Sequence, residues 1–435
     1  MSHGSHRIER TVAVGGLARV EGEGSLLVEV HDGVVTDVAL RIFEPPRFFE
    51  ALLRGRRADE APDLTARICG ICPVAYQMSA CTAVEDACGV AVDHRVSELR
   101  RLLYCGEWIQ SHALHVYLLH APDFLGCADA VELAERDREA VERGLRLKRT
   151  GNLVMETIGG RSIHPVNVRV GGFFPAPPPG AVASLAEPLR RARDDALATV
   201  EWVAGFDFPD VDGNYRFVAL RHPDRYPIES GRVGSSEGLD ESPAGFADRV
   251  VEEQVERSTA LHARLDGRRP YLTGPLARYA LNRDRLPEVA RQAADTASLG
   301  PVCTNPFRSI EVRAVELVFA CDEALRLVSD YRPPSPPAVE VPPRAGVGTG
   351  ATEAPRGLLL HRYELDEEGS ITSARIVPPT SQNQLVIEDD LRRVAQGALD
   401  LPDDELTWRC EQAVRNHDPC ISCAAHFLDV TVARR

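Results

Sequence analysis

Apolar side chains recur with two different periods along this chain, and the change between them predicts the architecture. Between residues 25 and 43 they occupy alternate positions on either side of Asp32-Gly33, which is typical of a β-hairpin with a tight turn. From Arg47 to about residue 330 the period becomes that of amphipathic helices, so a helical bundle should form the centre. The helices expected there span residues 47–54, 73–88, 93–120, 129–157, 181–204, 246–264 and 306–329.

Proline marks the boundaries of this helical region. A proline-rich stretch at 175–179 interrupts it once, and residues 333–343 carry six prolines, which predicts a stiff extended connector. A second hairpin is expected over Gly357–Val377, followed by helices near 386–397 and 402–415. The pattern predicts one α+β domain over residues 1–435, mainly a helical bundle with short β-hairpins near the N-terminus and before the C-terminal helices.

Charge and hydropathy exclude several classes of protein. A formal net charge of −15 without a basic block disfavours nucleic acid and anionic membranes as partners, because an acidic surface repels both. The N-terminus lacks the apolar core of a signal peptide, and no stretch approaches the roughly 20 apolar residues of a membrane span. We therefore expect a soluble protein that is not inserted in a membrane.

Two cysteine pairs at opposite ends of the chain are the main candidate chemistry. Cys69 and Cys72 follow Arg67-Ile, and Cys420 and Cys423 follow Asp418-Pro. Structural zinc sites usually draw their pairs from loops about 15–20 residues apart, whereas here most of the chain intervenes. One site made from both ends suits a catalytic centre better than a local staple. The spacing alone leaves zinc, iron–sulfur or another soft metal open.

An ordered set of further motifs resembles the large (alpha) subunit of nickel–iron (NiFe) hydrogenases over nearly the whole chain. The sequence Cys72-Pro-Val-Ala-Tyr76-Gln resembles the cytoplasmic, NAD(P)-linked branch of that family, known as group 3b or sulfhydrogenase. The resemblance rests on Arg19-Val-Glu21-Gly, Glu50, Arg67-Ile-Cys69-Gly-Ile-Cys72, Gly159-Gly-Arg-Ser-Ile-His164-Pro, Glu353-Ala-Pro355-Arg356-Gly and Asp418-Pro-Cys-Ile-Ser-Cys-Ala-Ala-His426.

The resemblance implies a nickel–iron centre on the four cysteines. Cys69 and Cys420 would be terminal nickel ligands, and Cys72 and Cys423 would bridge nickel to an iron that carries carbon monoxide and cyanide. Soft thiolates suit nickel. The implied activity is reversible heterolytic cleavage of dihydrogen.

The resemblance also assigns the surroundings of that centre. Arg356, after Pro355, would direct a fixed cation at the open face of the metals, and Asp418 would anchor it. Thr380 matches a hydroxyl that hydrogen-bonds cyanide, whereas Gln382 replaces a tryptophan common in the family. An arginine or an Asp-Pro in a loop is more often only a solvated charge or a turn former, so these roles depend on the motif.

Two glutamates receive roles in the same way. Glu21 would take the proton from a terminal thiolate, Cys420, because a partly buried carboxylate can titrate near working pH. Glu50, the carbonyl of Ile376 and His426 would hold a magnesium or second iron ion. Without the motifs, both glutamates would be interpreted as solvated surface charges.

Four residues, Trp108, His112, His115 and Leu119, share one helical stripe, which we interpret as core or partner-interface packing rather than ligation.

The resemblance further implies several partners. Iron–sulfur clusters are expected in a small subunit, and FAD in flavin- and NAD(P)-binding diaphorase subunits, because this chain has neither a cluster motif of its own nor a Gly-x-Gly-x-x-Gly. Maturation factors would insert the diatomic ligands, and a C-terminal peptidase would remove residues 427–435. The alternatives are a non-catalytic complex I-type interaction subunit, which lacks the four cysteines, and a zinc-stapled scaffold.

Overall fold

The computed structural model describes residues 10–425. Its helices and strands, in chain order, are β1 (Arg10–Val14), β2 (Gly24–His31), β3 (Val34–Ile42), α1 (Phe49–Leu53), α2 (Ala61–Ala66), α3 (Pro73–Cys88), α4 (His94–Leu114), α5 (Ala121–Leu125), α6 (Ala130–Arg136), α7 (Arg138–Gly159), β4 (Val168–Arg169), β5 (Gly172–Phe173), α8 (Pro179–Ala183), α9 (Ala186–Ala204), β6 (Val218–Arg221), β7 (Arg232–Ser235), β8 (Asp240–Glu241), α10 (Pro243–Arg249), β9 (Val250–Gln254), β10 (Leu261–Leu265), α11 (Pro275–Asn282), α12 (Glu288–Thr296), α13 (Ser309–Asp330), β11 (Gly346–Ala354), β12 (Gly357–Leu365), β13 (Ile371–Val377), α14 (Pro379–Gly397), α15 (Asp403–Arg415) and α16 (Ile421–Ala424).

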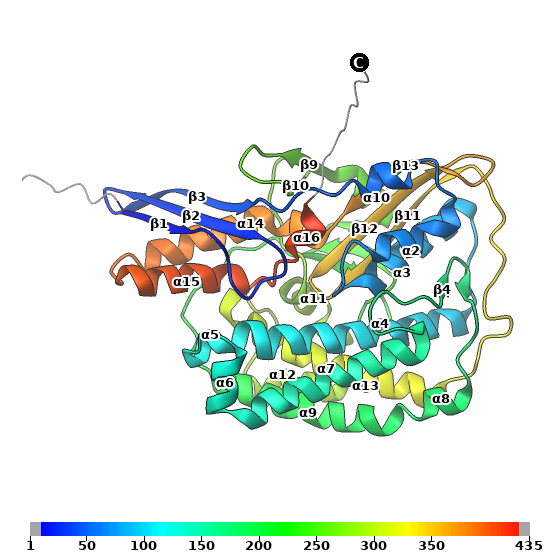
Figure 1. Ribbon diagram of the computed structural model, residues 1–435, viewed down its shortest axis with the longest axis horizontal. Coiled ribbons are helices and arrows are strands. Elements are labelled where there is room, and N and C mark those ends of the chain that lie inside the picture. Colours follow the sequence, from blue (N-terminus) through cyan, green and yellow to red (C-terminus); the bar gives the residue numbers. More distant parts are fainter. Residues whose placement is uncertain (1–9, 426–435) are drawn as a thin grey trace, which may run out of the picture.

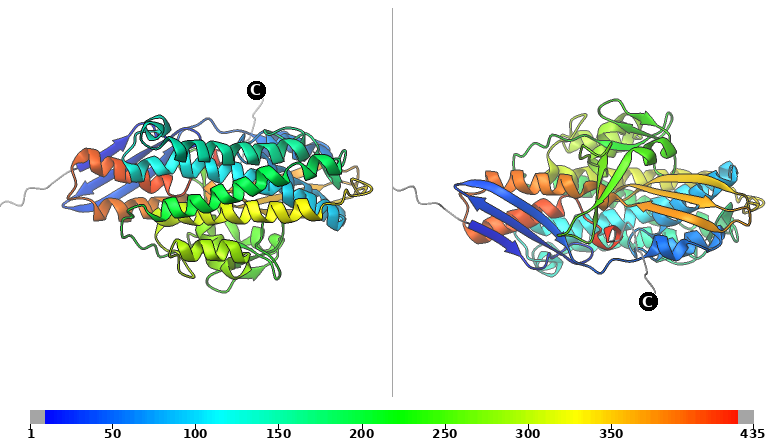
Figure 2. Two further views of the ribbon diagram at one scale, coloured as in Figure 1. Left: turned by 90° about the horizontal axis from the view of Figure 1, so that it is seen from below. Right: turned by 90° about the horizontal axis from the view of Figure 1, so that it is seen from above.

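Four long helices form the base of the molecule. α4, α7, α9 and α13 lie side by side (Figure 1), and the view from below shows α7, α9 and α13 running almost parallel (Figure 2). α4 is buried almost all round, so its side chains meet α7 and α13 as well as the layer above. The α+β fold class is confirmed.

The antiparallel sheet β11–β12–β13 lies above α4, and glycines bring its first strand against α3. A Cβ added at Gly348 would lie 2.0 Å from the carbonyl oxygen of Ala83, and one added at Gly350 would lie 2.2 Å from that of Ser79. Glycines at alternate positions of β11 therefore let its backbone touch the backbone of successive turns of α3. This packing places α3, which begins directly after Cys72, beside the loop that carries Arg356.

The two ends of the described chain meet at the centre. The sheet β1–β2–β3 packs on α14 and α15, with Val28, Leu40 and Leu391 in a shared apolar core. α16 lies between this part and the β11–β13 sheet (Figure 1). Backbone pairing between Glu21 and Cys420 joins the N-terminal loop to the C-terminal loop.

Several sequence-based expectations about the elements were wrong. Residues 246–264 were expected to be helical, but α10 ends at Arg249 and the chain continues as the β9–β10 hairpin. Ala263 and Leu265 are buried in a core with Leu220 and Leu358, so packing against distant strands decides between the two structures. The expected helix at 129–157 is divided by Asp137 into α6 and α7, and the second hairpin gains β11 as a third strand.

The sequence pattern also missed short elements between the long helices. They include α2, β4–β5, β6–β8, α11 and α12. In the part of the chain that the structure describes, no helix is both long enough and apolar enough to cross a bilayer.

Candidate metal centre

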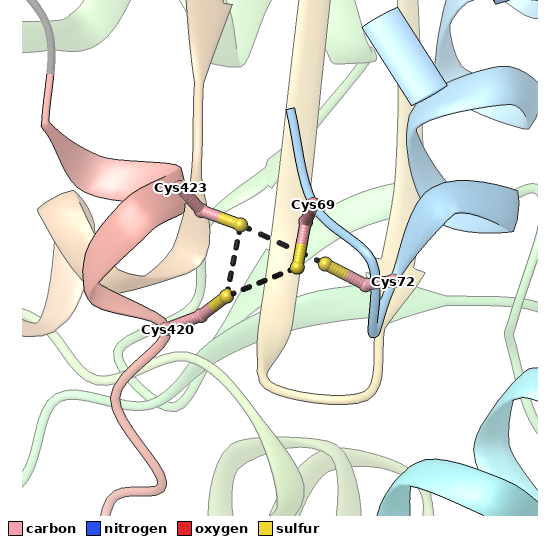
Figure 3. A group of neighbouring side chains, drawn as sticks. All are labelled: Cys69, Cys72, Cys420 and Cys423. Atoms are coloured by element: carbon pink, nitrogen blue, oxygen red, sulfur yellow. Dashed lines mark hydrogen bonds between the residues drawn. The ribbon is translucent and has the colours of Figure 1, made fainter. Parts of the chain in front are cut away.

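Four cysteine sulfurs from the two ends of the chain converge on one buried point (Figure 3). The sulfur–sulfur distances are 3.4 Å for Cys69–Cys420, 3.7 Å for Cys72–Cys423 and 2.9 Å for Cys420–Cys423. All four sulfurs lie within 4.8 Å of one another, and none is in a disulfide. Thiolates bound to a metal at about 2.3 Å would be separated by about 3.8 Å in a tetrahedron, so small shifts would convert this cluster into a ligand set.

The N-terminal pair is held at the start of a helix. Cys72 precedes Pro73, the first residue of α3, where a missing N–H costs nothing. Glu107 of α4 accepts hydrogen bonds from the main-chain N–H groups of Val74 at 2.6 Å and Ala75 at 3.1 Å. Glu107 is fully buried, and burial raises its pKa well above the ordinary value. The sequence did not single out this carboxylate, because its partners are main-chain groups distant in the chain.

The C-terminal pair is held by main-chain contacts with the N-terminal loop and with α14. Ile421 N–H donates to the carbonyl oxygen of Glu21 at 3.0 Å. Cys420 N–H donates to Thr380 Oγ1 at 2.9 Å. Thr380 therefore reaches the cysteine loop as an acceptor, which leaves its own hydroxyl hydrogen available to a group in the pocket.

Arg356 lies beside the cluster and is anchored by Asp418. Its Nε donates to the carbonyl oxygen of Asp418 and its Nη2 to Asp418 Oδ1, both at 2.9 Å. Both side chains are buried, and Arg356 Nη1 has no protein partner among the described residues. Burial raises the pKa of Asp418 although Arg356 opposes this shift. The predicted pairing of these two residues is thus present, with one guanidinium nitrogen left for a ligand.

A buried ion-pair network behind Arg356 was not predicted. Arg278 of α11 is doubly hydrogen-bonded to Glu316 of α13, at 2.7 Å for each contact. The same guanidinium donates to the carbonyl oxygens of Ala354 at 2.8 Å and Pro355 at 2.9 Å. Burial alone would raise the pKa of Glu316, but Arg278 lowers it to about 2, so the pair is ionised. Arg278 thereby fixes the main chain immediately before Arg356.

Glu21 lies beside the C-terminal cysteine loop. Its Oε2 accepts from Ser422 N–H at 3.0 Å, and Ser422 Oγ donates to Glu44 Oε2 at 2.9 Å. Burial raises the pKa of Glu21, and nearby Cys69 raises it further. The proton-acceptor role of Glu21 stays a prediction, and Glu44, which the sequence did not indicate, joins the same hydrogen-bonded group through Ser422.

The structure describes only part of the predicted magnesium or iron site. Glu50 Oε1 accepts from Ile376 N–H at 2.7 Å, and burial raises the pKa of Glu50 to about 7. A cavity of about 20 Å³ adjoins Glu50, Ile376, Cys423 and Ala425. His426 and residues 427–435 lie outside the described residues.

Two further residues singled out in the sequence make buried hydrogen bonds. Gln382, in place of the family tryptophan, donates to the carbonyl oxygen of Leu358 at 2.5 Å and accepts from Tyr271 at 3.1 Å, so it links the sheet to α14. Trp108 donates to the carbonyl oxygen of Glu353 at 3.0 Å and is fully buried.

The two histidines of the Trp108 stripe also pack inside. His112 and His115 are buried, which identifies core rather than interface packing. The helix changes to a π-helical segment over His115–His120, and this change alters the register that the sequence pattern assumed.

The donor set fits a soft metal centre. Four thiolates in one buried cluster suit nickel and iron, and Arg356 lies close enough to balance part of their charge. The hydrogen bond with the Cys420 thiol lowers the pKa of Cys69, whereas burial raises that of Cys420. A bound metal cation would favour the ionised form of the whole group.

Comparisons with known proteins agree with this geometry. The sequence model described as nickel-dependent hydrogenase matches residues 47–152. The chain is 33% identical over 421 residues to the sulfhydrogenase 1 subunit alpha of Pyrococcus furiosus, covering 96% of this chain and 98% of that protein. It is 27% identical to the beta subunit of the NAD-reducing hydrogenase HoxS of Cupriavidus necator, covering 97% and 96%.

Solved structures are similar over the same length. A crystal structure of an NAD⁺-reducing nickel–iron hydrogenase in its dihydrogen-reduced state superimposes with a TM-score of 0.84 at 28% identity, covering 96% of this chain and 99% of that chain. A nickel–iron–selenium hydrogenase of Desulfomicrobium baculatum superimposes with a TM-score of 0.79 at 23% identity, covering 96% and 100%, and supports the fold.

Proposed function

The chain belongs to the nickel-dependent hydrogenase family, and from that premise we propose its reaction, the residues that carry it and the partners that complete it. It is the catalytic subunit of a nickel–iron hydrogenase, an oxidoreductase that cleaves or forms dihydrogen. The observation that carries this assignment is the buried cluster of Cys69, Cys72, Cys420 and Cys423, with Arg356 beside it.

The four cysteines would hold the metals as the family resemblance implies. Cys69 and Cys420 would be terminal on nickel, and Cys72 and Cys423 would bridge nickel and an iron with carbon monoxide and cyanide ligands. When bound, this centre supplies the soft, redox-active site for heterolytic cleavage of dihydrogen.

The chain itself supplies a fixed cation and a proton acceptor. Arg356 Nη1 has no protein partner among the described residues and would face the open side of the centre. Asp418 holds the guanidinium group of Arg356, and Arg278 holds the carbonyl oxygen of the preceding Pro355. Thr380 would donate its free hydroxyl hydrogen to a cyanide. Glu21 would accept a proton released at Cys420, because its carboxylate is partly buried and held by Ser422 N–H.

A second, hard cation would bind on the other side of the C-terminal loop. Glu50 would provide a carboxylate oxygen, Ile376 its carbonyl oxygen and His426 a ring nitrogen to magnesium or a second iron. The small cavity beside Glu50 and Ala425, where the described chain ends, supports this placement.

Electrons would leave through partner subunits. A small subunit with iron–sulfur clusters would take them, and flavin- and NAD(P)-binding diaphorase subunits would pass them on. One relative, named an NAD-reducing hydrogenase, supports the NAD linkage. We further propose a cytoplasmic location, insertion of the metals by maturation factors, and removal of residues 427–435 by a C-terminal peptidase, which an intact mass of the holoprotein would test.

Infrared spectroscopy with metal quantitation on protein from its native host tests the proposal. We expect bands of iron-bound carbon monoxide and cyanide, with nickel and iron near one each per chain. Replacement of Cys72 by Ser should abolish the bands and the nickel together. Zinc at the cluster without those bands in processed protein would refute the assignment.

A further inference from the structure

We propose that Lys148 and Gln110 are positioning residues that fix the Cys69–Cys72 loop from the side of the helical bundle. This inference rests on the proposed function, because it assigns to the metal-binding loop a support that the family motifs do not include. Lys148 is the only lysine among the 50 lysine and arginine residues of the chain. Its place in the fold links it to the cluster through one intermediate side chain.

The first link is between Gln110 and the loop. Gln110 of α4 is buried, and its Nε2 donates to the carbonyl oxygen of Ile71 at 2.7 Å. Ile71 lies between the two cysteines, and its own N–H points at Cys69 Sγ at 3.3 Å. A displacement of the Ile71 peptide would therefore move the sulfur of a proposed metal ligand.

The second link orients the Gln110 amide. Lys148 Nζ of α7 donates to Gln110 Oε1 at 3.1 Å. An amide between a cation and a carbonyl group has one favourable orientation, with its oxygen toward the cation and its NH₂ toward the carbonyl. Lys148 is half-buried, so its charge is only partly screened by solvent. The ammonium thus selects the amide orientation that holds Ile71.

The close crossing of α4 and α7 brings the two side chains together. A Cβ added at Gly151 would lie 2.6 Å from both the carbonyl oxygen of Gly106 and the N atom of Gln110. Lys148 lies one turn before Gly151 on α7, so the backbone contact places its ammonium over Gln110. Glu107, one turn before Gln110, holds the other side of the loop at the start of α3.

Hydrogen exchange measured by mass spectrometry on the full-length, metal-free chain tests the inference. Gln110→Leu and Lys148→Met should each make exchange of a peptide spanning residues 68–78 on the order of three- to tenfold faster, as expected for loss of one hydrogen bond. Arg149→Met is the matched control, since Arg149 is exposed on the same helix, and it should exchange like the wild type. Wild-type exchange in Lys148→Met would overturn the proposal.

The double variant tests whether Lys148 acts through Gln110. If it does, Lys148→Met should add nothing further in the Gln110→Leu background. Additive effects would overturn the link. Because the chain has one lysine, acylation of the Lys148 side chain can be followed in one peptide, apart from the α-amino group, and this acylation should be faster in Gln110→Leu than in the wild type. Equal rates would contradict the contact between the two side chains.

A spectroscopic readout separates positioning from general stability. In metal-loaded enzyme, Lys148→Met and Gln110→Leu should shift the infrared bands of the iron-bound diatomic ligands, whereas Arg149→Met should leave them in place. Unmoved bands in both variants would refute a positioning role at the centre. Failure of the proposed function would instead appear as missing bands in the wild type, while the exchange experiment on metal-free protein would still report on the loop.

Discussion

Disrupting the buried pair of Arg278 and Glu316 should destabilise the protein and loosen the segment that carries Arg356. Both side chains are almost completely inaccessible to solvent, and the pair is doubly hydrogen-bonded. In the variant Arg278→Met, the carboxylate loses its main partner, and the carbonyl oxygens of Ala354 and Pro355 lose their donor. In Glu316→Leu, the guanidinium keeps only Glu353 as an acidic partner among the described residues.

The expected magnitude follows from the burial of the pair. Removing one member of a buried ion pair costs about 3–5 kcal/mol, because the other charge remains without compensation. At about 2.1 cal/mol/K per residue, a chain of this length unfolds with an entropy of about 0.9 kcal/mol/K, so each single variant should lower Tm by about 3–6 °C. The double variant removes both charges of the pair and leaves only Glu353 without its contact to Arg278, so its loss should be below the sum of the two.

Thermal unfolding of the full-length chain, followed by circular dichroism, measures these shifts. Arg232→Met is the control, because Arg232 forms an exposed pair with Asp240 that should contribute no more than about 1 kcal/mol. A decrease of less than about 1 °C in both single variants would refute the reasoning. An additive double variant would refute the coupling between Arg278 and Glu316.

Three further predictions concern the proton acceptor, the sheet packing and acid stability. Glu21→Gln keeps an acceptor for Ser422 N–H, so the metals should remain bound, but the rate of dye-linked hydrogen oxidation should fall by a factor of about 10²–10⁴. An unchanged rate would exclude Glu21 as the proton acceptor. Gly350→Ala would place a Cβ 2.2 Å from the carbonyl oxygen of Ser79 and should lower the free energy of unfolding by about 3 kcal/mol or more. A wild-type Tm in this variant would contradict the close contact. Burial lowers the pKa of His361 to about 3, so between pH 6.5 and 3 the unfolded chain binds a proton that the native chain does not, and the free energy of unfolding decreases as the pH is lowered. Urea unfolding of His361→Phe across that range should show a weaker pH dependence than the wild type. An equal pH dependence would count against this assignment.

Strong local patterns predicted much of the fold. The helix expected at 73–88 is present with those bounds, and the hairpin expected at 25–43 forms β2 and β3. In both, the apolar period and the local signals, Pro73 at a helix start and Asp32-Gly33 at a turn, agree with each other. Where the period was ambiguous, as at 246–264, the pattern predicted the wrong element, because burial against distant strands decided the structure.

The candidate site was predictable only where residue type itself carries the chemistry. The cysteine pairs indicate a soft-metal centre through the chemistry of their side chains. The roles expected for the Glu353–Arg356 motif followed only from the family resemblance. By contrast, Glu107, Arg278 and Gln110 resemble ordinary polar residues of amphipathic helices, and nothing local distinguishes them from solvated side chains.

The sequence by itself determined the ligand types, the two cysteine motifs and the long amphipathic helices, because these depend on residue chemistry and short-range periodicity. The resemblance already implied one site for Cys69 and Cys420, 351 positions apart, and the structure brings their sulfurs to 3.4 Å. Tertiary structure alone decided that Arg278 is buried against Glu316 rather than exposed. Contacts between distant segments depend on how whole layers pack, and burial is what turns a surface charge into a fixed partner of the metal-binding loops.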